Sequence, residues 1–109
     1  MGKSRDLAGL EFLTSSASVS AATATAVTLF TLPSNQFATY IVTAGLIAGD
    51  PGNYHEVAVI SQQGSTLQVN VLVNAALTNI TVSGLNIQAS QSSGITATIQ
   101  GRLTCLSRE

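Results

Sequence analysis

The sequence predicts an all-β protein, an antiparallel β-sandwich or jelly-roll-like domain of about seven strands. Three observations support this fold class. Apolar and polar residues alternate over much of residues 25–106, clusters of turn residues interrupt that alternation at short intervals, and no segment shows the helical period. The chain has 109 residues, of which 45% are hydrophobic. This length and composition fit one domain with one core.

The first residues differ in character from the rest of the chain. Residues 1–16 combine an irregular apolar pattern with four charges, at Lys3, Arg5, Asp6 and Glu11. We interpret this segment as an N-terminal connector and residues 17–109 as the β-sandwich domain. Residues 17–28 are rich in alanine, serine, threonine and valine, and their β-branched members favour an extended chain.

The period-2 pattern begins with residues 25–32 and stops at the Pro-Ser-Asn turn of residues 33–35. Residues 37–48 follow, and they are apolar at both odd and even positions. That segment is therefore expected to be a strand buried on much of both faces. The Gly-Asp-Pro-Gly-Asn run at residues 49–53 predicts a turn, since proline fixes φ and glycine accepts positive φ.

A hairpin is expected in the middle of the chain. Its first strand spans residues 54–61, and Gln-Gln-Gly-Ser at residues 62–65 supplies the turn. The second strand places four apolar side chains on one face: Leu67, Val69, Val71 and Val73. This alternation is typical of a half-buried antiparallel strand.

Two features mark the C-terminal third. The apolar positions change from even to odd at Gly84, which predicts a β-bulge or a corner there. After a turn at residues 90–94, residues 95–105 form the longest clean alternation in the chain. Cys105 falls in the apolar phase of that strand, so we interpret it as a small buried side chain. As the only cysteine, it excludes an intrachain disulfide.

The charge distribution excludes several partner classes. Charged residues make up 8% of the chain, and between Glu11 and Arg102 only Asp50 and Glu56 carry a formal charge. A nucleic-acid ligand is not expected, since phosphate binding needs a basic patch. No apolar segment is long enough to span a bilayer, so no membrane insertion is expected. Neutral hydroxyl and amide side chains must supply most of the polar surface.

Reactive groups are scarce. His55 is the only histidine, and Asp50 and Glu56 are the only carboxylates near it. We expect no metal site, no cofactor and no enzymatic activity, because the spacing matches no metal-ligand or hydrolase motif. In the plainest interpretation, Asp50 caps a turn while His55 and Glu56 lie at a solvent-facing strand end.

Carbohydrate binding is a more plausible use of the same segment. Sugars are commonly held by aromatic faces together with hydroxyl, amide and carboxylate groups, and this segment supplies that mixture beside a turn. Tyr40 is the only tyrosine apart from Tyr54. The candidate ligand-binding residues are Asp50, Asn53, Tyr54, His55, Glu56 and Tyr40.

Self-association is also expected. A β domain of this size with three phenylalanines and no tryptophan has little material for a thick core, and its sheets have edges to protect. A nearly charge-free surface can be shared by identical subunits without burying ions.

The order of strands and turns resembles the C-terminal domains of bacteriophage tail fibres and tailspikes over roughly residues 26–106. The resemblance rests on the pattern of strand and turn residues in these segments: 29–33, 38–44, Tyr54 with the strand after it, 80–85, Ser93-Gly94 and Arg102-Leu103. It implies a small β-sandwich that forms a homotrimer at the distal tip of a virion fibre, outside the cell. Such a tip serves trimerisation, binding of a bacterial cell-surface polysaccharide, or both.

Fibre proteins are usually long, so the resemblance implies either a domain excised from a chain with upstream fibre domains or a small stand-alone virion protein. Two alternatives remain open. One is a monomeric carbohydrate-binding module, and the other is a trimeric jelly roll similar to tumour necrosis factor, on a spore or other surface.

Overall fold

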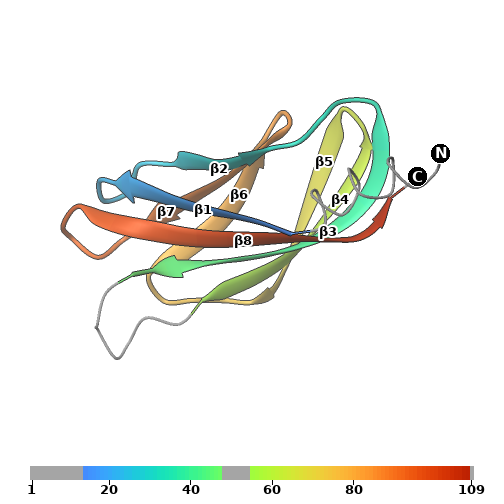
Figure 1. The fold of residues 1–109 in the computed structure, drawn as a ribbon. Helices are drawn as coiled ribbons and strands as arrows, with labels where there is room; N and C mark the ends of the chain where they lie inside the picture. Colours follow the sequence, from blue (N-terminus) through green and yellow to red (C-terminus); the bar gives the residue numbers. More distant parts are fainter. Residues whose placement is uncertain (1–13, 48–54, 109) are drawn as a thin grey trace.

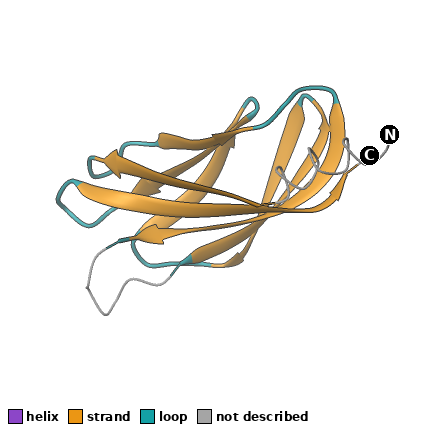
Figure 2. Ribbon diagram, in the orientation of Figure 1, coloured by secondary structure: helices purple, strands orange, loops and turns teal. Residues whose placement is uncertain are grey.

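The computed structural model describes residues 14–47 and 55–108, and within them the prediction of an all-β fold is confirmed. These residues form eight strands in two antiparallel sheets and contain no helix (Figures 1 and 2). The described segments therefore include no helix of the length and apolarity needed to cross a membrane.

The larger sheet has five strands in the order β1-β8-β3-β4-β5. Their bounds are Thr14–Ala21 for β1, Ala97–Arg108 for β8, Gln36–Leu46 for β3, Glu56–Gly64 for β4 and Thr66–Val73 for β5. The smaller sheet has the order β2-β7-β6, with bounds Val27–Thr31, Asn86–Gln91 and Thr78–Ser83. In Figure 1, β8 runs along most of the molecule beside β3.

Two hairpins close on glycine. Gly64 has a φ of 67° and begins the two-residue turn between β4 and β5. The turn therefore lies within the predicted residues 62–65, but Gln62 and Gln63 still belong to β4. Gly84 has a φ of 57° and begins the equivalent turn between β6 and β7. The predicted bulge or corner at Gly84 is therefore wrong. The apolar parity changes there because the chain reverses, so that Val82 pairs with Ile87 on the same face.

The core lies between the two sheets. Its fully buried aliphatic side chains come from both sheets: Val42, Ala44, Ala58, Ile60, Ile80, Ile87, Ala89 and Ile99. Gly101 in β8 allows the sheets to approach closely, since a Cβ there would lie 2.8 Å from Leu29 Cδ1. Cys105 is buried and forms no disulfide, which confirms its interpretation as a small core residue.

One predicted boundary can be compared with the strands. β1 begins at Thr14, so it crosses the expected boundary between the connector of residues 1–16 and the domain of residues 17–109. The predicted turn at residues 49–53 lies outside the described residues.

The outer face of the five-stranded sheet carries a cluster of aliphatic side chains. Ile41 in β3 pairs with Val59 in β4, and Val57 in β4 pairs with Val73 in β5. A bulge near Val57 brings Val73 to this face, so the prediction that Val73 shares a face with Val69 and Val71 is wrong. We call Ile41, Val57, Val59 and Val73 the aliphatic face.

No described residue covers the aliphatic face with a further layer. Val73 is 51% exposed, and Ile41, Val57 and Val59 are half-buried. The strand expected to be buried on both faces is therefore fully buried on one face only: Ala38, Tyr40, Val42 and Ala44 face the core, while Ile41 faces outward. Thr39, Thr43 and Thr104 border the aliphatic face, as does Asn70, which pairs with Val59. The nearest paired charge is Arg102, opposite Thr43.

The outer face of the three-stranded sheet has a different composition. Thr28 accepts a hydrogen bond from Gln88 Nε2 at 3.2 Å, and the Thr31 hydroxyl donates to Asn86 Oδ1 at 2.8 Å. Asn79 and Thr81 complete this surface on β6. We call Thr28, Thr31, Asn79, Thr81, Asn86 and Gln88 the polar face.

Candidate functional site

The structure divides the predicted ligand-binding residues into separate locations. Asp50, Asn53 and Tyr54 lie outside the described residues. His55, Glu56 and Tyr40 are described, and they do not share one site.

His55 is exposed and immediately precedes β4. Its imidazole ring lies directly against the backbone of Gly45 in β3, where a Cβ would overlap His55 Cδ2. His55 also lines a hollow of about 290 Å³ together with Thr43, Gln100 and Arg102. The missing side chain at Gly45 thus leaves room for the His55 ring. The sequence pattern alone did not connect Gly45 with His55.

Glu56 faces the interior, so the interpretation that it lies at a solvent-facing strand end is wrong. The residue is only 1% exposed. Its Oε2 accepts a hydrogen bond from the Ile80 N–H at 2.8 Å, and its Oε1 accepts one from the Ala75 N–H at 3.2 Å. Because Ile80 belongs to β6, the carboxylate links the five-stranded sheet to the three-stranded sheet.

A signal in the sequence pointed to this burial. Glu56 has the same parity as Ala58 and Ile60, both of which are fully buried. Along a strand, residues two apart face the same side of the sheet. The buried carboxylate is acceptable because each oxygen receives a backbone N–H, which satisfies the rule that buried polar groups find hydrogen-bond partners.

Tyr40 lies elsewhere along the same inner face. It pairs with Ile60, whereas Glu56 pairs with Ala44, so about four residues of strand, or roughly 13 Å, separate the two positions. The Tyr40 hydroxyl lies 3.2 Å from Gln62 Oε1 and 3.3 Å from Gln36 Oε1, and its single proton can be donated to either oxygen. Gln62 Nε2 in turn donates to the carbonyl oxygens of Pro33 at 2.6 Å and Gly64 at 3.0 Å.

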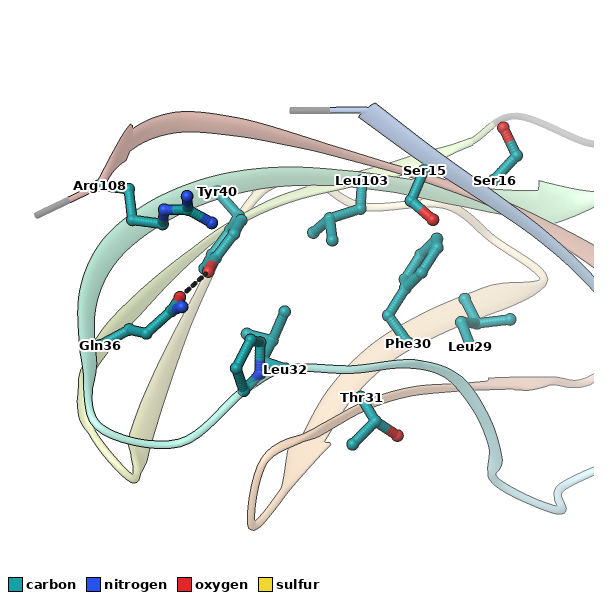
Figure 3. Close-up of a pocket in the computed structure, with 11 residues that line it drawn as sticks. Ser15, Ser16, Leu29, Phe30, Thr31, Leu32, Gln36, Tyr40, Leu103 and Arg108 are labelled. Carbon is teal, nitrogen blue, oxygen red and sulfur yellow. Dashed lines mark hydrogen bonds between the residues drawn. The ribbon is translucent and has the colours of Figure 1, made fainter. Parts of the chain in front are cut away.

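A cleft of about 610 Å³ adjoins Tyr40 between the sheets (Figure 3). Figure 3 shows Tyr40 and Arg108 at one end of the cleft and Phe30 toward the other. Burial raises the pKa of Tyr40, the Cys105 thiol raises it further, and the Arg108 guanidinium opposes both effects. Since Tyr40 is 3% exposed and its hydroxyl is already bonded to glutamines, we interpret it as a structural residue of the cleft wall.

A second hollow, of about 360 Å³, lies over Glu56 and was not anticipated. Its wall includes Thr78 at the start of β6 and Gln91 at the end of β7. The Gln91 amide is fully used: Nε2 donates to the carbonyls of Ala21 at 2.8 Å and Ile95 at 2.7 Å, and Oε1 accepts from the Ser93 N–H at 2.7 Å.

Thr78 in the same hollow differs from Gln91 in its hydrogen bonding. It is 4% exposed, and among the described residues its buried Oγ1 has no hydrogen-bond partner. An unpaired buried hydroxyl costs about 1–3 kcal/mol, so each such group calls for an explanation. No sequence pattern marks Thr78, since its lack of a partner depends on the residues that the fold brings around it.

Comparison with known proteins finds similarity only at the level of the fold. No family model matches the chain, and no curated protein matches it. Two solved structures match, both of phage tailspikes. One is tailspike protein gp49 of Acinetobacter baumannii bacteriophage Fri1, a capsular polysaccharide depolymerase, with a TM-score of 0.62 and 14% identity over 84% of this chain.

The other is the tailspike protein of Acinetobacter phage vB_ApiP_P1, with a TM-score of 0.46 and 9% identity over 86% of this chain. The chain spans 17% of the first tailspike and 21% of the second. At this level of identity, the first match establishes a shared fold. The described β-sandwich is therefore similar in fold to a small part of a phage tailspike.

Proposed function

We propose that this chain is a domain of a phage tail fibre or tailspike, located at the distal tip, which forms a homotrimer and binds a bacterial surface polysaccharide. The observation that carries the proposal is the fold shared with part of the Fri1 tailspike, at a TM-score of 0.62. That protein acts on a capsular polysaccharide. In this proposal the domain belongs to the virion and works outside the host cell.

The aliphatic face supports the homotrimer. Ile41, Val57, Val59 and Val73 form a charge-free group on a sheet surface that no described residue covers. Identical subunits can bury such a surface without desolvating an ion, and burial of apolar area drives association. A monomeric carbohydrate-binding module would leave these side chains in water.

A non-catalytic role is supported by the bonding of Glu56. Glycosidic bonds are usually hydrolysed by two carboxyl groups at a fixed separation, one acting as a general acid. Glu56 is the only acidic side chain among the described residues, and both of its oxygens accept backbone N–H groups. We therefore assign it to binding and structure in this proposal.

Light scattering coupled to size-exclusion chromatography tests the assembly. The expected mass is three times the chain mass of 11.1 kDa. A monomer at micromolar concentration would contradict the trimer and favour the binding-module alternative. Binding of the intact protein to an array of purified capsular and lipopolysaccharide glycans tests recognition, and shortening of a bound glycan would contradict the non-catalytic role.

A further inference from the structure

We propose that the hollow over Glu56 and Thr78 is a subsite for one neutral, hydroxyl-rich sugar unit. This inference rests on the proposed function, since it names where and how the polysaccharide would be held. Two buried polar groups of the hollow carry it: a carboxylate with unused acceptor capacity and a hydroxyl with no partner.

The carboxylate of Glu56 has acceptor capacity left. An ionised carboxylate offers about four lone-pair positions, and the N–H groups of Ala75 and Ile80 occupy two of them. Among the described residues that line the hollow, none carries a positive charge. A ligand hydroxyl could donate to the carboxylate and would relieve part of the cost of burying its charge.

The Thr78 hydroxyl completes the pattern. Its Oγ1 is buried and unpartnered among the described residues, while the neighbouring Gln91 amide is fully bonded within the protein. A threonine hydroxyl can both donate and accept. In this proposal a sugar hydroxyl in the hollow donates to Glu56 and accepts from Thr78, the two lining groups whose hydrogen-bonding capacity the described residues do not fill.

The rim of the hollow points to the same ligand class. Asn74, Asn79, Ser90 and Ser92 surround it with amide and hydroxyl groups. Its volume of about 360 Å³ is at the lower end of the roughly 300–1,000 Å³ range of ligand pockets, which suits one sugar unit more than an extended chain.

Charged ligands fit less well. An acidic sugar would bring a second negative charge beside the buried Glu56. A divalent cation such as Ca²⁺ usually takes six to eight oxygen ligands, several of them carboxylates, and the described residues contain no group of three or more potential metal-binding side chains of histidine, cysteine, aspartate or glutamate. The proposal is therefore specific for a neutral sugar.

The decisive variant is Thr78→Val, which keeps the shape of the side chain and removes the hydroxyl. Because that hydroxyl has no hydrogen-bond partner among the described residues, the variant should unfold at the same temperature as the wild type or at a higher one. Its affinity for a neutral sugar should fall roughly three- to tenfold, the value of one hydrogen bond. Thr81→Val on the outer side of the same strand is the matched control and should bind as the wild type does.

Amide NMR titrations supply the readout. D-glucose, D-galactose and N-acetyl-D-glucosamine are the neutral probes, and D-glucuronate is the charged comparison. We expect at least one neutral probe to shift the amide signals of Ala75, Thr78 and Asn79, with D-glucuronate much weaker. Unchanged affinity in Thr78→Val, shifts confined to other residues, equal binding of D-glucuronate, or no binding of any neutral probe would each overturn the proposal. So would the same shifts with CaCl₂ alone.

The two proposals can fail separately. If the wild type and Thr78→Val bind a bacterial polysaccharide equally, the subsite is wrong and the proposed function stands. If the wild type binds no polysaccharide on the glycan array and none of the neutral probes, both are wrong.

Discussion

The outer faces of the two sheets have different chemistry although both lie on the outside of the same sandwich. The aliphatic face of the five-stranded sheet presents Ile41, Val57, Val59 and Val73. The polar face of the three-stranded sheet presents threonine, asparagine and glutamine side chains that hydrogen-bond across the strands, as between Gln88 and Thr28. Both faces are almost free of charge, so charge alone does not distinguish them.

The difference indicates which outer face of the sandwich is better suited to contact with solvent. Hydroxyl and amide groups on the polar face keep hydrogen-bonding capacity at the surface, whereas the aliphatic face offers none. Apolar surface is not unusual by itself, but a contiguous group on one sheet marks an interaction site more often than scattered residues do. In the proposed trimer, the five-stranded sheet would provide the contact between subunits and the three-stranded sheet would face solvent.

A charge placed on each face is expected to give the largest contrast. Val59→Lys puts an ammonium group beside Ile41 in the proposed subunit interface, where desolvation costs several kcal/mol. The trimer should dissociate at concentrations at least about a hundredfold higher than in the wild type. Because the dissociation constant of a trimer scales with the square of the concentration, this shift corresponds to about 5.5 kcal/mol per trimer, or about 2 kcal/mol for each substituted subunit. Sedimentation velocity over a dilution series measures the change.

Gln88→Lys provides the matched control on the polar face. Gln88 pairs with Thr81 on one side and Thr28 on the other, so the lysine remains in water and the oligomeric mass should not change. Circular dichroism should show the wild-type strand content in both variants. Equal weakening of the trimer by both lysines would remove the distinction between the faces.

Substitutions at Glu56 test the stability of the sandwich separately from its assembly. Glu56→Ala removes the acceptor of two buried N–H groups, at Ala75 and Ile80, and should lower the free energy of unfolding by about 2–4 kcal/mol. Glu56→Gln keeps one acceptor oxygen and should lose about half as much. Urea denaturation measures both values.

These variants should leave the oligomeric mass unchanged wherever the protein remains folded, because Glu56 faces the interior and not the aliphatic face. A Glu56→Ala protein as stable as the wild type would show that the carboxylate does not link the sheets.

The smallest expected effect comes from Tyr40 and appears at alkaline pH. Burial raises the pKa of Tyr40 in the folded protein above its ordinary value of 10.0. The unfolded chain then loses this proton first as the pH rises, so the folded state binds more protons and its stability falls above about pH 10. Below that pH, both states hold the proton and the group has no effect.

Tyr40→Phe should flatten this alkaline decline, as measured by thermal melts across the pH range. The phenolate absorbance of the wild type should show one late-titrating tyrosine that the variant lacks. A decline of the same steepness in Tyr40→Phe would mean that other groups cause it.

The fold was more predictable than the site, and particular residues show why. The hairpin at Gly64 could be predicted because strand alternation and a turn residue are both local properties. The reversal at Gly84 was interpreted as a bulge or corner because parity alone cannot tell a bend from an antiparallel return. Cys105 was placed correctly in the core by its parity.

The candidate site depended on residues distant in sequence. Glu56 was singled out as chemically unusual, yet its actual partners, Ala75 and Ile80, lie 19 and 24 residues away. Tyr40 was grouped with it by residue type, although the structure bonds its hydroxyl to Gln36 and Gln62 in a separate cleft. Thr78 carried no signal, because an unpaired hydroxyl is defined by its surroundings.

The sequence by itself determined the fold class, the position of the hairpin turn at Gly64 and the scarcity of charge, because alternation, turn chemistry and composition act over a few residues. Only the tertiary structure decided which sheet each strand joins, that Glu56 bridges the sheets, and that Ile41 and Val59 face outward with no covering layer. These features arise from contacts between segments far apart in the chain, and such contacts depend on the packing of the whole sandwich.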